Sequence, residues 1–516
     1  MPAASGPTLT NDETRPVTTS PAPASPAPAE TAPPGTALSG TTLSGTALSD
    51  GAAEHASREL LRLATAGSVD DGKSTLIGRL LYDTKSVLAD QLSAVERATA
   101  ARGAAEGEVD LALLTDGLRA EREQGITIDV AYRYFSTARR AFVLADTPGH
   151  VQYTRNMVTG ASTAQLAIVL VDARKGVLEQ TRRHATVAAL LGVPHVLLAV
   201  NKMDLVDFDE ATFRTIADDF AAYAAGLGLP DVLAVPVSAL TGDNVVDRST
   251  RTPWYDGPTL LEHLETVPVS DLRADDELRL PVQLVIRPRT AEHPDYRGYA
   301  GRITSGTVRV GDQVTVLPSG RTSVVTGIDE FAGPLESAAA GRSVTVRLAD
   351  ELDISRGDVL VPAGARTTLG QDLVGTVCWL SERRSVLGAR LLVRIGTRTV
   401  RALLREVDAR LDVDTQTVEL VSGVDTRYAL DATDTSSDAA PSALGLNAIG
   451  RVRVRLAEPV LLDDYAAHRG TGAFLLVDPS DGTTLAAGMV GPTLLDRLAP
   501  TAEGESDTDW LAGAGI

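Results

Sequence analysis

The chain has 516 residues, of which 43% are hydrophobic, and its formal net charge is −20 at pH 7. This length predicts roughly three domains at ~150 residues each, and the acidic excess disfavours nucleic acid or anionic membranes as partners. The single cysteine, Cys378, excludes an internal disulfide and a thiolate metal cluster, and no apolar run approaches the ~18 residues of a membrane span. We therefore expect a cytoplasmic protein with Cys378 in its core.

The chain begins with a segment that cannot form a core. Residues 1–55 contain no aromatic residue and consist mainly of Ala, Pro, Thr, Ser and Gly, with three five-residue repeats that begin at Gly35, Gly40 and Gly45. Such a composition buries too little apolar surface to offset its ordering entropy, so we predict a disordered leader. At the other end, residues 496–516 read as an acidic tail.

Residues 56–271 show an α/β pattern. Short apolar runs without polar alternation predict parallel strands covered on both faces, and amphipathic stretches between them predict helices. The predicted strands are 61–66, 141–145, 166–171, 196–200 and 232–237, and the predicted helices include 75–81, 180–191 and 210–225.

The pattern changes after residue 271. Strand-like runs are now separated by Gly, Pro and Asp turns, which is typical of small antiparallel barrels. We predict a second domain over 272–365 and a third over 366–495. The predicted strands are 282–286, 306–310, 314–317, 343–348 and 358–361, then 375–380, 389–395, 400–407, 451–456 and 472–477.

The first of four short motifs is Gly67-Ser-Val-Asp-Asp-Gly-Lys-Ser74, which follows the first predicted strand. Its glycines let backbone N–H groups approach phosphate oxygens, and the next helix directs its N-terminus at their charge. Lys73 would reach the β and γ phosphates, and Ser74 would ligate Mg²⁺.

The second motif, Asp146-Thr-Pro-Gly-His150, follows the second strand. Asp146 is expected to hold the Mg²⁺ shell, and His150 stands where an imidazole can orient a water towards the γ-phosphate. Thr127 is the candidate switch residue that would coordinate Mg²⁺, although a β-branched residue that starts a strand explains it equally well.

The third and fourth motifs, Asn201-Lys-Met-Asp204 and Ser238-Ala-Leu240, decide which base is bound. The Asp204 carboxylate can accept hydrogen bonds from both N1–H and the 2-amino group of guanine, and adenine presents no such pair of donors. The sequence thus predicts a GTP site. Its nucleotide-binding residues are Gly67, Ser68, Val69, Asp70, Asp71, Gly72, Lys73, Ser74, Thr75, Asp146, Thr147, Pro148, Gly149, Asn201, Lys202, Asp204, Ser238, Ala239 and Leu240.

With two barrels after it, this set of motifs resembles the translation elongation factor class of GTPases. The longer strings 67–83, 114–135 and 153–162 are more similar to the large GTPase subunit of bacterial sulfate adenylyltransferase. The resemblance runs from about Arg58 to Val490, is strongest in the first domain, and is weakest around the polar stretch 431–441.

That resemblance implies a role in sulfate assimilation. A separate small subunit of the ATP-pyrophosphatase type would make adenosine 5′-phosphosulfate and pyrophosphate from ATP and sulfate, driven by GTP hydrolysis on this chain. The resemblance also allows an adenylylsulfate kinase as a partner. A second GxxxxGK[ST], a Ser-Gly-Gly-x-Asp-Ser loop and the His-x-Gly-His of single-chain sulfurylases are all absent from the sequence, so the adenylyl-transfer site is expected on another chain.

Two alternatives keep the same motifs. A factor that delivers aminoacyl-tRNA is disfavoured by the net charge and by only four lysines among 48 basic residues, but Arg383, Arg384, Arg390 and Arg394 could form a local patch. A GTP-dependent regulatory scaffold without coupled chemistry is disfavoured by His150, because pure binding needs no water-positioning group.

Overall fold

The computed structural model describes residues 59–87, 89–101, 110–114, 130–148, 154–229, 231–269, 275–291, 295–421, 443–492 and 494–498. All of them belong to the compact unit Arg58–Ile516. The predicted leader, residues 499–516 of the predicted acidic tail, the candidate switch residue Thr127, and Gly149 and His150 of the second motif lie outside the described residues. The first three residues of the predicted tail, 496–498, end a short helix.

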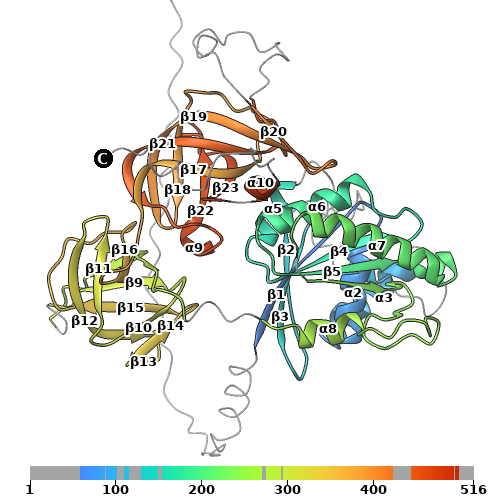
Figure 1. Cartoon of the computed structure of the whole chain (residues 1–516). Helices are drawn as coiled ribbons and strands as arrows, with labels where there is room; N and C mark the ends of the chain where they lie inside the picture. Colours follow the sequence, from blue (N-terminus) through green and yellow to red (C-terminus); the bar gives the residue numbers. More distant parts are fainter. Residues whose placement is uncertain are drawn as a thin grey trace, which may run out of the picture. The chain divides into compact units, whose positions relative to one another are not determined.

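A mixed sheet forms the centre of the first domain (Figure 1). The five predicted strands are confirmed and run parallel to one another. An additional edge strand, β2, pairs antiparallel with β3; its side chains alternate between exposed and covered, so it shows no apolar run in the sequence. Among the described residues the order is β2 (Ala131–Ser136), β3 (Ala141–Asp146), β1 (Leu60–Gly67), β4 (Leu166–Asp172), β5 (His195–Asn201) and β6 (Val232–Pro236).

Helices cover both faces of this sheet. Leu76 and Leu80 of α2 pack with Leu264 of α8 against one face, whereas Val158 of α5 and Phe220 of α7 belong to the apolar cluster on the other. The predicted helices are confirmed as α2, α6 and α7. The helical elements are α2 (Lys73–Asp83), α3 (Ala89–Ala101), η1 (Leu111–Leu114), α5 (Thr154–Ala161), α6 (Glu179–Leu190), η3 (Met203–Val206), α7 (Glu210–Gly226) and α8 (Leu260–Thr266).

The second domain is an antiparallel barrel. The extended chain from Leu280 to Ile286 closes it, because Val282 N–H donates to Asp358 O at 2.8 Å and Gln283 N–H donates to Ala300 O at 2.8 Å on the other side. Its strands are β7 (Leu280–Pro281), β8 (Leu284–Ile286), β9 (Gly298–Arg302), β10 (Thr307–Arg309), β11 (Gln313–Leu317), β12 (Arg321–Glu330), β13 (Gly333–Leu335), β14 (Ser337–Ala339), β15 (Ser343–Leu348) and β16 (Val359–Pro362).

The third domain is a second closed barrel. Within the described part of the chain, the ring runs β18, β22, β23, β17, β21, β19 and back to β18, with β20 added at the edge of β19. The strands are β17 (Leu369–Trp379), β18 (Arg390–Ile395), β19 (Arg398–Asp412), β20 (Thr417–Leu420), β21 (Ile449–Leu461), β22 (Ala473–Val477) and β23 (Thr484–Val490), and the helices are α9 (Arg469–Gly472) and α10 (Leu494–Leu498). The predicted fold class is therefore confirmed, whereas the domain boundaries remain predictions.

The third domain packs on the first through one shared apolar cluster. Leu190 of α6 and Phe220 of α7 belong to the same cluster as Leu411 of β19 and Met489 of β23. Cys378 lies in this cluster too, with 2% of its surface exposed, and burial raises the pKa of its thiol to about 12. Cys378 is thus a core residue, as predicted, and is held as an unreactive thiol.

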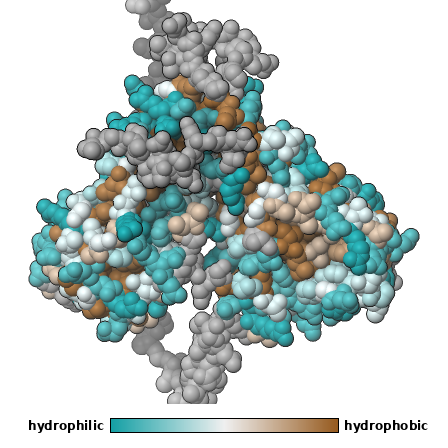
Figure 2. Space-filling view, in the orientation of Figure 1, coloured by the Kyte–Doolittle hydropathy of each residue, from teal (hydrophilic) through white to brown (hydrophobic). Residues whose placement is uncertain are grey.

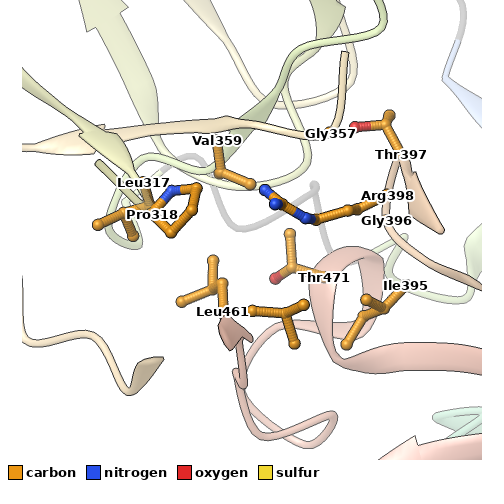
Figure 3. A pocket seen from close by; sticks show the side chains of 11 residues that line it. Leu317, Pro318, Gly357, Val359, Ile395, Gly396, Thr397, Arg398, Leu461 and Thr471 are labelled. Carbon is orange, nitrogen blue, oxygen red and sulfur yellow. The ribbon is translucent and has the colours of Figure 1, made fainter. Parts of the chain in front are cut away.

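A buried ion pair joins the two barrels. Arg279 Nε lies 2.9 Å from Asp463 Oδ2, and both side chains are almost completely buried. Thr471 Oγ1 also donates to Asp463 Oδ2, at 2.6 Å. A small cavity of ≈ 30 Å³ lies close by, lined by Leu317, Pro318 and Arg398 among others (Figure 3). A space of this size holds about one water molecule and is far too small for a nucleotide.

We expect Asp463→Ala to lower the free energy of unfolding by about 3 kcal/mol, because it leaves the Arg279 guanidinium buried without its main partner. Glu277→Ala is the matched control: Glu277 also pairs with Arg279, at 3.2 Å, but it is half-exposed, so its loss is expected to cost about 0.5 kcal/mol. Chemical denaturation monitored by Trp fluorescence measures both. Equal losses for the two variants would contradict the assignment of Asp463 as the main partner.

The surface visible in Figure 2 is mostly hydrophilic, and its apolar residues form several separate patches. Among the described residues, none of the helices is long and apolar enough to cross a membrane.

Candidate nucleotide site

The four sequence motifs follow strands that end at the same edge of the first-domain sheet. β1 ends at Gly67, β3 at Asp146 and β5 at Asn201, and β6 ends two residues before Ser238. Because the carboxyl ends of parallel strands meet at one edge, this is where ligands bind in open α/β sheets. The structure thus brings together the described residues of all four motifs.

The first motif forms a loop that wraps around its own lysine. Asp70 and Gly72 adopt positive φ angles of 67° and 91°, and α2 begins directly afterwards at Lys73. Lys73 Nζ donates to Gly67 O at 2.7 Å and to Ser68 O at 3.0 Å. A Cβ at position 72 would lie 2.5 Å from Asn201 Nδ2, so glycine is required there by both conformation and space.

The charge of this loop is arranged for an anion. Burial lowers the pKa of Lys73, while the carboxylates of Asp146 and Asp71 favour its charged form. Burial, reinforced by the charge of Lys73, lowers the pKa of His184 on α6 to about 3. The His184 imidazole is therefore neutral at physiological pH and adds no positive charge beside Lys73.

Asn201 joins the first, third and fourth motifs. Its Nδ2 donates to Asp71 O at 2.8 Å, and its Oδ1 accepts from Ala239 N–H at 2.9 Å. Lys202 continues the connection, because its Nζ donates to Asp70 O and lies 3.1 Å from Asp172 Oδ2. Asn201 is 1% exposed, so its amide holds the three loops together from a buried position, and its predicted contact with the nucleotide remains a prediction.

Asp204 is oriented by the fourth motif. Ser238 Oγ donates to Asp204 Oδ1 at 2.6 Å, and Ser238 itself is completely buried. Leu240, at the end of the motif, is 67% exposed. An anchored carboxylate beside a loop of backbone N–H groups can accept from two adjacent N–H donors on one edge of a planar base.

The second motif is described as far as Pro148. Asp146 ends β3 with 2% of its surface exposed and accepts from Thr65 Oγ1 at 3.3 Å, and Thr147 Oγ1 donates to Thr65 O. The roles predicted for Gly149, His150 and Thr127 remain predictions, because these residues lie outside the described ones.

Two buried atoms of the loop suit a bound phosphate and its metal ion. Ser68 Oγ and Asp71 Oδ1 are buried without a hydrogen-bond partner in the described part of the chain, and burial raises the pKa of Asp71. Among the described residues, no three or more His, Cys, Asp or Glu side chains are grouped so that they could hold a metal ion by themselves. Mg²⁺ beside phosphates needs only one or two protein ligands, so Ser74 and Asp146 are a sufficient donor set.

Family models match all three domains. The elongation factor Tu GTP-binding domain matches residues 58–270, elongation factor Tu domain 2 matches 299–361, and the GTP-eEF1A C-terminal domain-like model matches 423–491. The chain is 49% identical over 438 residues to sulfate adenylyltransferase subunit 1 of Cellvibrio japonicus, which covers 85% of this chain and 88% of that protein.

The chain belongs to the sulfate adenylyltransferase subunit 1 family. It is also 54% identical to the bifunctional enzyme CysN/CysC of Mycobacterium tuberculosis, over 84% of this chain and 67% of that protein. A solved structure of sup35 complexed with GDP overlaps with a TM-score of 0.37 at 23% identity, covering 84% of this chain and 94% of that one. The predicted resemblance is confirmed: the chain is a GTP-binding GTPase subunit of a nucleotidyltransferase of sulfate assimilation.

In this subunit, sequence reasoning missed the residues that hold Lys202. Asp172 ends β4 beside Asn201, and it accepts from Arg174 Nη2 at 2.6 Å as well as from Lys202. Burial alone would raise the pKa of Asp172, but the hydrogen bonds from Arg174 and Lys202 hold it well below its ordinary value. The sequence did contain a signal for Asp172, which is a polar residue at the end of a fully buried strand. The same signal led to the prediction of Asp146 and Asn201 at the ends of the strands β3 and β5.

Arg79 on α2 was also missed. Its Nε donates to Ala239 O at 3.2 Å and its Nη2 donates to Leu240 O. These two hydrogen bonds attach the fourth motif to helix α2. A lone arginine on a helix carries no signal of such a contact, because its partner is 160 residues away in sequence.

Proposed function

We propose that this subunit hydrolyses GTP to drive the formation of adenosine 5′-phosphosulfate and pyrophosphate from ATP and sulfate on a separate small subunit. The observation that carries the proposal is the convergence of the four motifs at one sheet edge, in a chain whose relatives are named sulfate adenylyltransferase subunit 1. The word "subunit" in those names supports a partner chain, and we assign it the adenylyl-transfer site.

The proposed phosphate site uses the first two motifs. Lys73 leaves Gly67 O and Ser68 O to bind the β and γ phosphates, and the N-terminus of α2 faces the same charge. Ser74, Thr127 and Asp146 would hold Mg²⁺, which neutralises charge on the transferring phosphoryl group. His150 would orient the attacking water.

The proposed base site uses the other two motifs. The Asp204 carboxylate accepts from N1–H and the 2-amino group of guanine, and the backbone N–H of Leu240 donates to its carbonyl oxygen. The N–H groups of Ser238 and Ala239 donate to Asp243 O and to Asn201 Oδ1, so these two residues shape the loop around the base. The Nζ atom of Lys202 contacts Asp70 O, in the loop of the first motif, and Asp172. In the proposed site, the aliphatic part of the Lys202 side chain covers one face of the base.

The coupling proposal is tested by measuring GTP hydrolysis with the purified small subunit, ATP and sulfate, each omitted in turn. We expect hydrolysis to accelerate only when all three are present, and the amount of phosphosulfate formed to follow the amount of GTP consumed. A non-hydrolysable GTP analogue should support binding but little net product.

Opposite results point to the alternatives. A rate of GTP hydrolysis that is unchanged by these additions but is raised by ribosomes would overturn the proposal in favour of a translation factor. Tight GTP binding with no hydrolysis under any condition would favour a regulatory scaffold.

A further inference from the structure

The two loops of the proposed base site are far apart in the sequence, and one arginine contacts both sides. Asp204 lies in η3 (Met203–Val206), after β5, whereas the fourth motif follows β6. Arg251 lies beyond both motifs, in the segment between β6 and α8. Its guanidinium contacts Phe208 on the side of the third motif and Asp243 on the side of the fourth. Arg251 thus bridges the two halves of the proposed base site.

The contact between Arg251 and Asp243 has two hydrogen bonds. Arg251 Nε donates to Asp243 Oδ1 at 3.1 Å, and Arg251 Nη2 donates to Asp243 Oδ2. Asp243 Oδ1 also accepts from Ser249 Oγ at 2.7 Å. Burial alone would raise the pKa of Asp243, but the hydrogen bonds from Ser249, Thr241 and Arg251 hold it below its ordinary value. The carboxylate is therefore ionised at physiological pH and fixes the orientation of the planar guanidinium.

Two hydroxyl groups connect Asp243 to Asp204. Thr241 Oγ1 donates to Asp243 Oδ2 and accepts from Arg251 Nη2 at 2.9 Å. Thr241 Oγ1 also lies 2.8 Å from Ser238 Oγ, which in turn donates to Asp204 Oδ1 at 2.6 Å. The backbone joins the same loop, because Ser238 N–H donates to Asp243 O at 3.2 Å. The orientation of the Asp204 carboxylate therefore depends on how firmly this loop is held.

The contact with Phe208 holds the other half of the site. The guanidinium carbon of Arg251 lies 4.4 Å from the centre of the Phe208 ring, within the range of a cation–π interaction. Phe208 is buried; its N–H donates to Met203 O at 2.9 Å, and its carbonyl oxygen accepts from Trp254 Nε1 at 3.1 Å. Met203 directly precedes Asp204 in η3. The ring that Arg251 contacts is thus attached to the element that carries Asp204.

We propose that Arg251 is a positioning residue for guanine recognition. By contacting Phe208 and Asp243 together, it sets the distance between the Asp204 carboxylate and the backbone N–H of Leu240, so that both meet one base. This inference rests on the base site given under the proposed function. The polar contacts that Arg251 makes with the described residues lie around the fourth motif, so the predicted effect is on base preference.

The inosine nucleotide is the probe that isolates this effect. Hypoxanthine keeps the N1–H and the carbonyl group of guanine but lacks the 2-amino group, so it has one donor fewer for Asp204. A carboxylate that is held in place favours guanine by the missing hydrogen bond, whereas a displaced carboxylate distinguishes the two bases less well. The ratio of the dissociation constants for inosine and guanosine diphosphates therefore reports the position of Asp204.

The chain offers a matched control in Arg248, on the same segment. Both Arg248 and Arg251 are exposed. Arg248 Nη1 donates to Tyr255 O at 3.1 Å, and Arg248 Nη2 donates to Gly257 O at 2.9 Å. Both acceptors are backbone carbonyls outside the four motifs. Arg248→Ala thus removes a side chain of the same kind without removing a contact to either half of the base site.

The test measures the affinities of Arg251→Ala, Arg251→Lys and Arg248→Ala for the two diphosphates in the full chain, together with the thermal midpoint. Arg251→Ala should lower the preference for the guanine nucleotide roughly 3- to 10-fold, whereas Arg248→Ala should keep the preference of the parent. Arg251→Lys should recover part of the loss, because an ammonium keeps the charge beside Asp243 but not the planar fork.

A double-mutant cycle tests whether Arg251 acts through Asp243. Arg251→Ala should change the base preference less in an Asp243→Asn background than in the parent chain, because the paired contact is already weakened there. Fully additive effects of the two substitutions would contradict the proposed bridge.

An unchanged base preference in Arg251→Ala would overturn the inference, as would equal losses of affinity for the two nucleotides, which indicate a general effect on the fold of the site. A parent chain that binds both nucleotides equally well would overturn the proposed base site itself. The two failures are distinguishable because the first is observed only in a parent chain that prefers guanine.

Discussion

Replacing His150 with alanine is expected to slow GTP hydrolysis by on the order of 10²-fold or more while GTP affinity stays near that of the parent. The residue follows Asp146-Thr-Pro148, and Asp146 is buried at the end of β3 beside Thr65. In the proposed role, an imidazole at this position would orient a water in line with the γ-phosphate without a contact that the ground-state nucleotide needs. Removing it therefore raises the barrier without weakening binding.

The control is His150→Gln, whose amide can still accept from and donate to a water and should keep part of the rate. Single-turnover release of phosphate, measured together with the dissociation constant of a GTP analogue, separates the two effects. If His150→Ala hydrolyses GTP at the parent rate, another group positions the water.

Asp204→Asn is expected to weaken GTP binding by on the order of 10²- to 10⁴-fold and to improve binding of the xanthine nucleotide. The carboxylate is anchored by Ser238 Oγ at 2.6 Å. In the proposed base site it would accept from two guanine N–H groups, each a hydrogen bond to a charged acceptor. An amide places a donor against one of them, which removes one bond and creates a donor–donor clash. The 2-oxo group of xanthine accepts from that same donor.

Ser238→Ala is the matched control for this exchange. It removes the hydrogen bond that orients Asp204 but leaves the carboxylate, so GTP affinity should fall modestly and the preference for guanine should persist. Competition binding of the guanine and xanthine nucleotides measures both variants. Unchanged GTP affinity in Asp204→Asn would refute the base-pocket assignment.

Much of the first domain was predictable because its strands are continuous apolar runs. A strand such as β4 is buried at every position, and this pattern marks it in the sequence without any knowledge of its neighbours. The edge strand β2 was not recognised, since Tyr132 and Tyr134 are exposed and the strand pairs on one side only. Similar short or alternating strands were missed in the barrels, where pairing partners and not composition decide whether a segment is extended.

The motif residues were predictable for a different reason. The loop requires glycine with a positive φ at position 72, a lysine that it encloses, and polar residues at the strand ends. Each requirement involves residues that are close together in the sequence, so a short motif is enough to reveal it. The four motifs also occur in the order in which the strands supply them, so their common edge followed from the α/β pattern.

The fold class, the bound base and the family could all be predicted from the amino-acid sequence, because strand burial, loop chemistry and the longer strings are local properties of the chain. The contacts that support the site became visible only in the folded chain: Asp172 and Arg174 with Lys202, Arg79 with the fourth motif, and Arg251 with Phe208 and Asp243. These contacts join residues from separate segments of the first domain. A long cationic side chain has the same appearance in a sequence whether it faces water or ties two loops together, and only packing distinguishes the two.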